Sequence, residues 1–334
     1  MMKQYLAAVT DFTFSNLDQE KRVLEPLGFR IITGQCKTAT DVIELCQNAD
    51  AILTQFAPIT SDVIRHLRNC RIIVRYGIGV DTVDIDAASE AGILVVNIPD
   101  YGIQEVADHT MSLLLAAVRK IPAVVAQVRR GQWENAPFRP IMGLSGKTLG
   151  LAGLGNIARA VAQRAQAFNL NVIAYDRYAP KEVFTEWNVR RVEWEQLLAT
   201  SDILSIHLPL TEQTRHLLNR EAFSKMKESA VLVNTSRGGV VDAEALEVAL
   251  KTNQIAGAAL DVLEEEPISP EHPLLQLSQC LITSHCAWYS EDSIIRLQQF
   301  AAMEICRLFS GERPKHIVNS SAVQESYMSR EDNR

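Results

Sequence analysis

The sequence predicts an α/β fold made of two doubly wound parallel sheets. Short apolar runs alternate with helical segments over residues 1–100, and the same alternation returns over residues 147–285. A glycine-rich turn joins a strand-like run to a helix-like run at 147–168, and polar residues follow one predicted strand after another. The 334 residues suffice for two domains, each with its own core.

In the first half, strands are expected at 5–10, 30–33, 51–54, 71–75 and 93–97. The loop after the fourth of these strands, at 75–81, is rich in glycine. Two glycines allow consecutive backbone N–H groups to point the same way and form a nest for an anion such as a substrate carboxylate. The residues concerned are Tyr76, Gly77, Ile78 and Gly79. A flexible connection between strand and helix is the alternative.

One long helix is expected from about 105 to 129, because apolar residues recur along it at helical spacing. At about 1.5 Å per residue it would be nearly 40 Å long, more than one small domain requires. We therefore expect it to pack across a dimer interface or along the cleft between domains.

The turn after the strand that begins near residue 148 has the pattern Gly-x-Gly-x-x-Ala, with Gly153, Gly155 and Ala158. This pattern is typical of a dinucleotide fold, in which pyrophosphate binds at the start of the following helix, here Asn156 and Ile157. A merely tight turn between strand and helix is the alternative. The next strand, at 171–175, ends in Asp176, whose carboxylate would bind ribose hydroxyls and repel a 2′-phosphate. The glycine pattern and Asp176 together favour NAD over NADP, and the neighbouring Arg177 weakens this preference slightly.

Further strands are expected at 203–206, 231–233, 258–260 and 281–283, followed by a helix at 289–308 and a frayed polar tail at 320–334. In a doubly wound sheet the ligand site lies at the carboxyl ends of the strands. Polar residues stand just beyond those ends, namely Asp176, His207, Thr235, Arg237, Asp261, Glu266 and His285.

The composition limits the function classes. A formal net charge of −7 argues against direct binding to nucleic acid or to an anionic membrane surface. No apolar run reaches the ~18 residues that span a bilayer, and the N-terminus lacks a signal-peptide core, so we expect a cytoplasmic protein. The six cysteines lack metal-ligand spacing, which predicts buried free thiols and no bound metal.

Taken together, these segments resemble the D-isomer-specific 2-hydroxyacid dehydrogenases over nearly the whole chain. The resemblance lies in 75–81, 150–158 with Asp176, 207–211, 233–239, 258–267 and 284–287. Residues 287–291 look most like the C-terminal binding protein branch and its bacterial relatives. The resemblance implies a flavodoxin-like substrate domain of 1–100 and 290–334, into which a Rossmann NAD-binding domain of 101–289 is inserted. One departure is Ser284, where the family usually has proline; serine leaves φ at this position free to vary and removes no catalytic group.

The resemblance also implies roles for individual residues. His285 would be the acid/base that exchanges a proton with the substrate oxygen, and Arg237 would clamp the substrate carboxylate and carbonyl. Composition does not choose among Glu264, Glu265 and Glu266. The family pattern selects Glu266, directly before proline, as the carboxylate that fixes the histidine tautomer and favours its protonated form. Further implied contacts are the nicotinamide amide at Asp261, where a plain strand-end cap is the alternative, the cofactor groove at His207 and Thr235, and an aromatic wall near the substrate at Trp288.

These observations predict an NAD-dependent oxidoreductase that interconverts a 2-oxo acid and a D-2-hydroxy acid, acting as a homodimer. Within enzymes, 3-phosphoglycerate dehydrogenase is the alternative. A different class also stays open, an NAD(H)-sensing corepressor or scaffold like the C-terminal binding proteins, because that branch keeps the same three catalytic residues.

Overall fold

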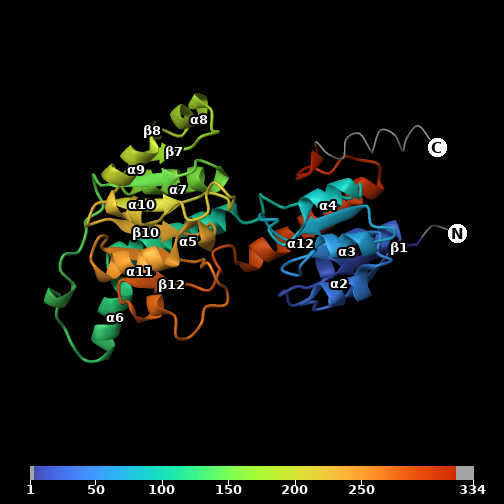
Figure 1. The fold of residues 1–334 in the computed structure, drawn as a ribbon, viewed down its shortest axis with the longest axis horizontal. Coiled ribbons are helices and arrows are strands. Elements are labelled where there is room, and N and C mark those ends of the chain that lie inside the picture. The colour runs from blue at the N-terminus through green and yellow to red at the C-terminus, as the bar shows by residue number, and fades with distance from the viewer. Residues whose placement is uncertain (1–3, 321–334) are drawn as a thin grey trace. The chain divides into compact units, whose positions relative to one another are not determined.

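The structure is a computed structural model that describes residues 4–320, so all but the first residue of the expected polar tail at 320–334 lies outside the described residues. The chain divides into two compact units. Unit 1 comprises the residues up to Gly102 and those from Ser290 onward, and unit 2 comprises Ile103–Tyr289 (Figure 1). Each unit is built on its own parallel sheet.

Unit 1 has a five-stranded parallel sheet in the order β2-β1-β3-β4-β5, the order of the flavodoxin-like doubly wound fold. The strands are β1 (Tyr5–Val9), β2 (Phe29–Thr33), β3 (Ala51–Thr54), β4 (Ile72–Arg75) and β5 (Leu94–Val96). The helices are α1 (Asp18–Leu24), α2 (Ala39–Cys46), α3 (Ser61–His66), α4 (Ile85–Glu90) and α12 (Glu291–Phe309), with the short 3-10 turn η1 (Glu25–Leu27). All five expected strands of this unit are present, with ends that differ by one residue or less.

A buried polar group ties the start of the glycine-rich loop of unit 1 to two helices. The fully buried Glu20 of α1 accepts hydrogen bonds from the Tyr76 hydroxyl at 2.7 Å and from the Gln298 amide of α12 at 3.0 Å. Burial raises the pKa of this carboxyl, and the hydrogen bond to Tyr76 opposes the shift. The side chain of Tyr76 therefore belongs to the interior of unit 1.

Unit 2 has a seven-stranded parallel sheet in the order β12-β11-β10-β9-β6-β7-β8. The strands are β6 (Thr148–Ala152), β7 (Asn171–Tyr175), β8 (Arg190–Arg191), β9 (Ile203–Ile206), β10 (Val231–Asn234), β11 (Gly257–Leu260) and β12 (Cys280–Ile282). The helices are α5 (Ile103–Val118), α6 (Ile121–Arg129), α7 (Asn156–Ala167), α8 (Lys181–Glu186), α9 (Trp194–Thr200), α10 (Arg220–Ser224) and α11 (Ala243–Lys251). Three 3-10 turns complete it, η2 (Ala136–Phe138), η3 (Gly238–Val240) and η4 (Pro273–Gln276). The sequence did not predict β8, a two-residue edge strand of two exposed arginines without an apolar signal.

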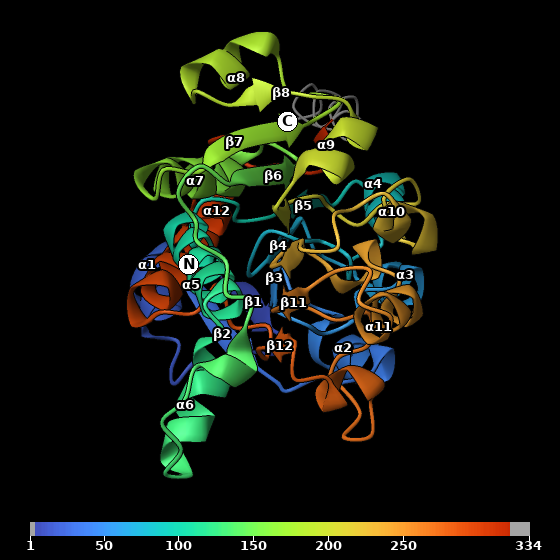
Figure 2. The same ribbon diagram turned by 90° about the vertical axis from the view of Figure 1, so that its left-hand side faces the viewer.

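The sheet of unit 2 is covered on both faces, as a parallel sheet requires. Helices α5 and α7 pack on one face and α9, α10 and α11 on the other, which Figure 2 shows with α7 to the left of the sheet and α11 to the right. Fully buried strand residues such as Leu149, Leu151 and Leu204 fill the two apolar layers.

The expectation of one long helix at 105–129 is wrong. Helix α5 ends at Val118, α6 begins at Ile121, and their axes differ in direction by 61°. Two residues cause the break: Lys120 adopts the left-handed conformation with φ 52°, and Pro122, in the first turn of α6, has no N–H to continue the helical ladder.

Among residues 4–320, no single helix is both long and apolar enough to cross a membrane. The bent pair α5 and α6 reaches that length and composition together. Most of the apolar residues of α5, among them Met111 and Leu114, are buried in the core of unit 2.

Candidate active site

The strands of unit 2 end in register, so that the residues that follow them form one row at the carboxyl edge of the sheet. Ala152 pairs with Tyr175 and Ile206, Ile206 with Asn234, Asn234 with Leu260, and Leu260 with Ile282. The next residue of each strand completes a row of Asp176, Gly153, His207, Thr235, Asp261 and Thr283. The structure thus aligns five predicted site residues with Thr283, which sequence reasoning did not single out.

Glycine stands at two positions of the turn after β6, for a different physical reason at each. Gly153 has φ +95°, and a Cβ there would lie 2.6 Å from the carbonyl oxygen of His207, so packing within unit 2 requires glycine. A Cβ on Gly155 would meet no atom within 4 Å. Gly155 is the N-cap of α7, followed by Asn156 and Ile157, and no side chain caps this helix N-terminus, whose first N–H groups have no partner within the helix. The open space at Gly155 fits a pyrophosphate at the helix N-terminus.

Asp176 fastens this turn to the turn after β7. Its Oδ2 accepts a hydrogen bond from the backbone N–H of Leu154 at 2.7 Å, and its Oδ1 accepts from Tyr178 and Ala179, both at 2.8 Å. A carboxylate offers about four acceptor positions, so one remains for a ribose hydroxyl.

His285 and Glu266 form a close pair. The distance from His285 Nδ1 to Glu266 Oε2 is 2.6 Å, and both side chains are about one third exposed. Burial opposes ionisation of Glu266, but hydrogen bonds from His285 and from the Leu263 N–H outweigh it and hold the pKa of this carboxyl below its ordinary value. Nδ1 of His285 is thereby committed to Glu266, while no described residue is hydrogen-bonded to Nε2.

The three neighbouring glutamates, which composition does not distinguish, have different surroundings. Glu264 pairs with His216, with 2.5 Å between Oε1 and Nε2, and lies 3.9 Å from Arg215. Glu266 alone among the three pairs with His285.

The loop that carries His285 is held by Asp261. The main-chain N–H of His285 donates to the Asp261 carbonyl at 2.8 Å. The Asp261 carboxylate, 1% exposed, accepts from the N–H groups of Cys286 at 3.0 Å and Ala287 at 2.9 Å, and from the Thr283 hydroxyl at 2.5 Å. Trp288 adds a bond from its indole N–H to the His285 carbonyl at 2.9 Å. His285, which has φ 52°, is therefore fixed in the left-handed conformation from both sides.

Arg237 begins the turn that follows β10. Asn234 shapes this turn, because its side chain donates to the Arg237 carbonyl at 2.9 Å and accepts from the Ser236 N–H at 3.0 Å. A Cβ on the next residue, Gly238, would lie 1.9 Å from the main chain of Leu263, so only glycine allows this turn to lie against the segment that leads to Glu266. The turns that carry Arg237 and Glu266 therefore pack together.

Two other residues of the row are engaged within the protein. His207 is partly buried, its Nε2 lies 2.9 Å from the Ser205 hydroxyl, and burial lowers its pKa to about 4, so it is neutral at physiological pH. The Thr235 hydroxyl lies 2.7 Å from that of Thr110 on α5. Their main-chain groups remain the parts available to line a cofactor groove.

In unit 1, the loop after β4 has the conformation of a tight turn. Gly77 has φ +133°, and its N–H donates to the Arg75 carbonyl at 2.9 Å. No described residue accepts a backbone hydrogen bond from Ile78 or Gly79. The Tyr76 side chain points to Glu20, so this loop offers main-chain groups rather than the tyrosine hydroxyl to a ligand.

Sequence reasoning missed His109 and Thr283. His109 lies on α5, and its Nε2 is 3.1 Å from the Thr283 hydroxyl and 3.5 Å from Asp261 Oδ1. Thr283 was missed because the strand expected at 281–283 included it, whereas β12 ends one residue earlier, at Ile282. His109 gives no signal in the sequence, because it lies about 150 residues before Asp261 in the chain.

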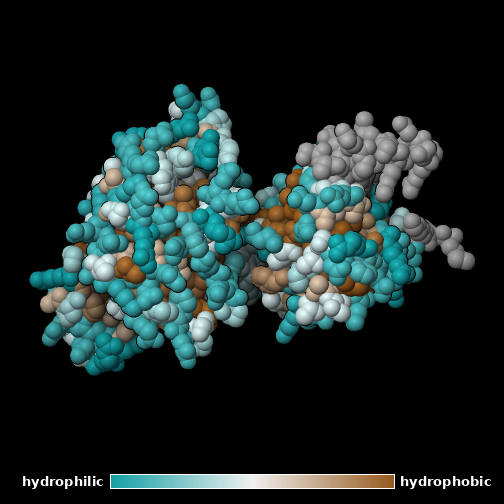
Figure 3. Space-filling view, in the orientation of Figure 1, coloured by the Kyte–Doolittle hydropathy of each residue, from teal (hydrophilic) through white to brown (hydrophobic). Residues whose placement is uncertain are grey.

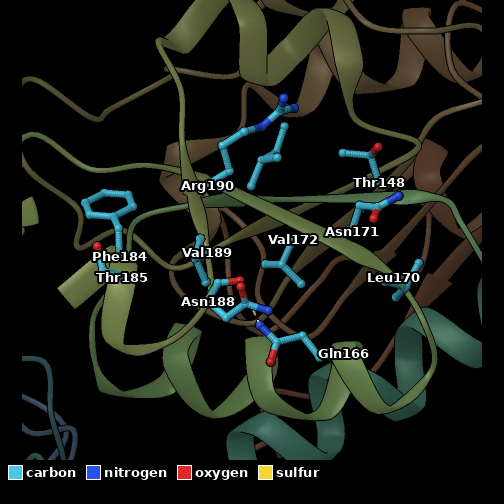
Figure 4. Close-up of a pocket in the computed structure, with 11 residues that line it drawn as sticks. Thr148, Gln166, Leu170, Asn171, Val172, Phe184, Thr185, Asn188, Val189 and Arg190 are labelled. Atoms are coloured by element: carbon cyan, nitrogen blue, oxygen red, sulfur yellow. Dashed lines mark hydrogen bonds between the residues drawn. The ribbon is translucent and has the colours of Figure 1, made fainter. Parts of the chain in front are cut away.

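Unit 2 has a hollow at the amino ends of β6, β7 and β8, opposite the predicted site residues, with a volume of about 630 Å³ (Figure 4). It includes the first residues of β6, β7 and β8, and none of the predicted site residues. Its lining is Thr148, Gln166, Leu170, Asn171, Val172, Ile173, Phe184, Thr185, Asn188, Val189 and Arg190.

The fold and the residues at the carboxyl edge of the unit 2 sheet define a doubly wound nucleotide-binding domain with a histidine–carboxylate pair. Comparison with known proteins agrees. The family model of the D-isomer specific 2-hydroxyacid dehydrogenase NAD binding domain matches residues 111–287. The glyoxylate reductase of Korarchaeum cryptofilum is 38% identical over 85% of each chain. The crystal structure of a glyoxylate reductase from Paecilomyes thermophila superposes with a TM-score of 0.86 and 27% identity, covering 96% of this chain and 100% of that one.

This chain belongs to the D-isomer specific 2-hydroxyacid dehydrogenase family. It is also 39% identical, over 91% of its length, to the D-3-phosphoglycerate dehydrogenase of Methanocaldococcus jannaschii. It spans only 58% of that relative and 51% of the D-3-phosphoglycerate dehydrogenase of Archaeoglobus fulgidus.

The anchoring of the His285 loop can be tested with Asp261→Asn. The amide group of asparagine places a donor where one carboxylate oxygen accepts, so at least one N–H of Cys286 or Ala287 loses its acceptor, at a cost of about 1 kcal/mol. We expect hydrogen exchange at these two amides to speed up several-fold, as measured by NMR or mass spectrometry. Asp242→Asn, which alters an acceptor at the N-cap of α11, is the control and should leave them unchanged. Equal exchange in Asp261→Asn and the parent would contradict the anchor.

Proposed function

We propose that this protein is an NAD-dependent oxidoreductase that interconverts a 2-oxo acid and a D-2-hydroxy acid. The observation that carries the proposal is the His285–Glu266 pair, 2.6 Å apart, with Nε2 of the histidine left for a substrate. Family membership supports the same reaction class, and relatives named glyoxylate reductase and hydroxypyruvate reductase act on small oxo acids.

In this mechanism, His285 Nε2 gives a proton to the carbonyl oxygen during reduction and takes it back during oxidation. Glu266 holds Nδ1, so that the exchanged proton is the one on Nε2, and its negative charge stabilises the imidazolium. Arg237 binds the carboxylate and carbonyl oxygens of the substrate with its planar fork. The nicotinamide, when bound, supplies or accepts the hydride.

The remaining predicted contacts belong to the same proposal. The pyrophosphate would lie at Gly155, Asn156 and Ile157, with main-chain groups of His207 and Thr235 along the groove. The nicotinamide amide would donate to Asp261. On the substrate side, the N–H groups of Ile78 and Gly79 would hold the carboxylate, within the loop that Tyr76 and Gly77 shape, and Trp288 would lie near the substrate side chain. Residues 1–100 with 290–334 would act as the substrate domain, and 101–289 as the NAD-binding domain.

The role of His285 can be tested with His285→Ala. We expect kcat for oxo-acid reduction to fall by roughly 10²–10⁴-fold, the usual contribution of general acid–base catalysis, with little change in NADH affinity. The assay is NADH oxidation with glyoxylate, hydroxypyruvate, pyruvate, phenylpyruvate and phosphohydroxypyruvate, and the last of these tests 3-phosphoglycerate dehydrogenase.

A matched control is His216→Ala, since His216 also pairs with a glutamate in unit 2 and should leave kcat unchanged. If no oxo acid is turned over while NADH still binds to the parent and to His285→Ala, the enzyme proposal fails and the NAD(H)-sensing corepressor is favoured.

We propose NAD rather than NADP as the cofactor, because the Asp176 carboxylate would repel a 2′-phosphate. Asp176→Ala should weaken NADH use and narrow the ratio of kcat/KM between NADH and NADPH. Thermal unfolding is the control for lost structure, since Asp176 also accepts three main-chain hydrogen bonds. Equal kcat/KM for the two cofactors in the parent would overturn this preference.

We propose a homodimer in which α6 lies at the interface. Ile121, Val125 and Val128 recur at helical spacing along α6 and are 50%, 42% and 43% exposed. In Figure 3 apolar atoms reach the surface at the lower left, where Figure 1 places α6. The corrected helix thus presents an apolar face, although it is shorter than the sequence predicted.

Sedimentation at micromolar concentration should show a dimer for the parent and a monomer for Val125→Glu, because the substitution places a charge within that face. Val248→Glu alters an exposed valine on α11 and should remain dimeric. A monomeric parent, with and without NAD, would rule the proposal out.

We also propose a cytoplasmic location, in keeping with six cysteines that are all free in the structure. Two of them, Cys36 and Cys46, are buried and the other four are partly buried. Recovery in the membrane or secreted fraction after cell fractionation would contradict this location.

A further inference from the structure

An imidazole, a carboxylate and a thiol meet at the carboxyl edge of the sheet of unit 2. His109 comes from α5, Asp261 follows β11, and Cys286 lies in the loop after β12. One potential ligand atom from each lies within 4.8 Å of the other two. His109 Nε2 is 3.5 Å and Cys286 Sγ is 3.7 Å from the same oxygen, Asp261 Oδ1.

These separations match the edges of a tetrahedral zinc site. With zinc–ligand distances of about 2.0–2.3 Å, tetrahedral angles place the ligand atoms of such a site about 3.3–3.6 Å apart. His109 Nε2 lies within that range of Asp261 Oδ1, Cys286 Sγ exceeds the range by about 0.1 Å, and these two ligand atoms lie within 4.8 Å of each other. Small side-chain adjustments would therefore bring three ligands around one ion.

The electrostatics of the cluster also favour a cation. Asp261 is 1% exposed, and the donors to its carboxylate are two main-chain N–H groups, one hydroxyl and the Cys286 thiol, none of which carries a charge. Within residues 4–320 the only ion-pair partner of Asp261 is His109. A buried carboxylate without a lysine or arginine attracts a positive ion.

The cluster is accessible to solvent, and its ligand types select among metal ions. The His109 side chain is 23% exposed, and Cys286 is partly exposed. Thiolate and imidazole ligands select zinc over magnesium and calcium, which prefer all-oxygen sites. Metal binding through His109 Nε2 requires the imidazole proton on Nδ1, and the ion would replace the contact of Nε2 with the Thr283 hydroxyl at 3.1 Å.

We propose that His109, Asp261 and Cys286 bind Zn²⁺, with water as the fourth ligand, and that bound zinc and bound nicotinamide exclude each other. The second half rests on the proposed function, in which the nicotinamide amide donates to Asp261. Zinc on this carboxylate would occupy the same acceptor, so the ion would act as an inhibitor of cofactor binding.

Binding converts the Cys286 thiol to a thiolate and releases its proton to solvent. Burial and the neighbouring Asp261 raise the pKa of this thiol, so the ion must displace a firmly held proton. The attraction of Zn²⁺ for the thiolate and for the Asp261 carboxylate opposes that cost.

The metal site is tested with cobalt(II), which replaces zinc and reports thiolate ligation by a charge-transfer band in the near ultraviolet. We expect the purified chain, without cofactor, to give this band at one cobalt per chain, and zinc to abolish it. Cys286→Ser should remove the band and weaken zinc binding by more than about 10-fold, the least expected when even a supporting residue of a metal site is lost.

Cys280→Ser is the matched control, because Cys280 is another partly buried thiol of unit 2, on β12, and should leave the band unchanged. His109→Asn gives a second test if Cys286→Ser does not fold, and it should weaken zinc binding similarly. A parent without a thiolate band, or a band that survives both Cys286→Ser and His109→Asn, would overturn the site.

The exclusion is tested by NADH fluorescence. Zinc should raise the apparent Kd for NADH in the parent and have no such effect in Cys286→Ser. An unchanged Kd in the zinc-loaded parent would overturn the exclusion. If NADH does not bind at all, the proposed function fails, whereas the cobalt titration still decides the metal site.

Discussion

The candidate site depends on the hydrogen bonds that the buried Asp261 accepts. Its carboxylate accepts hydrogen bonds from Thr283, Cys286 and Ala287, and the main chain of Asp261 accepts one more from His285. Ser284 precedes His285 where the family usually has proline, so no pyrrolidine ring restricts the φ of residue 284. The hydrogen bonds of Asp261 and of Trp288 hold the histidine in its left-handed conformation instead.

The register of the sheet turns these local contacts into a site. Because β12, β11, β10, β9, β6 and β7 are parallel and end at paired residues, each of these strands delivers its next residue to the same edge. The Gly153 turn fits there only because a glycine can approach the His207 carbonyl, and the Arg237 turn fits only because Gly238 can approach Leu263. Close backbone packing thus brings together polar side chains that are far apart along the chain.

The same edge combines two demands on one residue. As a hydrogen-bond acceptor, Asp261 orders the loop that carries His285, and in the proposed function it also accepts from the nicotinamide amide. As a buried charge beside His109 and Cys286, it also suits a soft cation. The spacing of cysteines along the chain predicted no metal, since spacing detects only ligands that are close in sequence. The three proposed ligands, from α5, the residue after β11 and the loop after β12, carry no such signal.

The sequence by itself determined the fold class and the residues at the strand ends, because buried parallel strands are continuous apolar runs that end in polar turns. Ten strands of the two units lie within about one residue of their predicted bounds, and an eleventh is shifted by one residue. Composition did not distinguish Glu264, Glu265 and Glu266; the family resemblance selected Glu266, and the structure places this carboxylate beside His285, whereas Glu264 pairs with His216. The break between α5 and α6 has a local cause, because Lys120 and Pro122 interrupt the backbone although the helical period continues. Only the tertiary structure decided that His109 of α5 lies beside Asp261 and Thr283, which are distant from it in the sequence. Side-chain periodicity reports which face is apolar, whereas backbone geometry and contacts between distant segments exist only once the chain has folded.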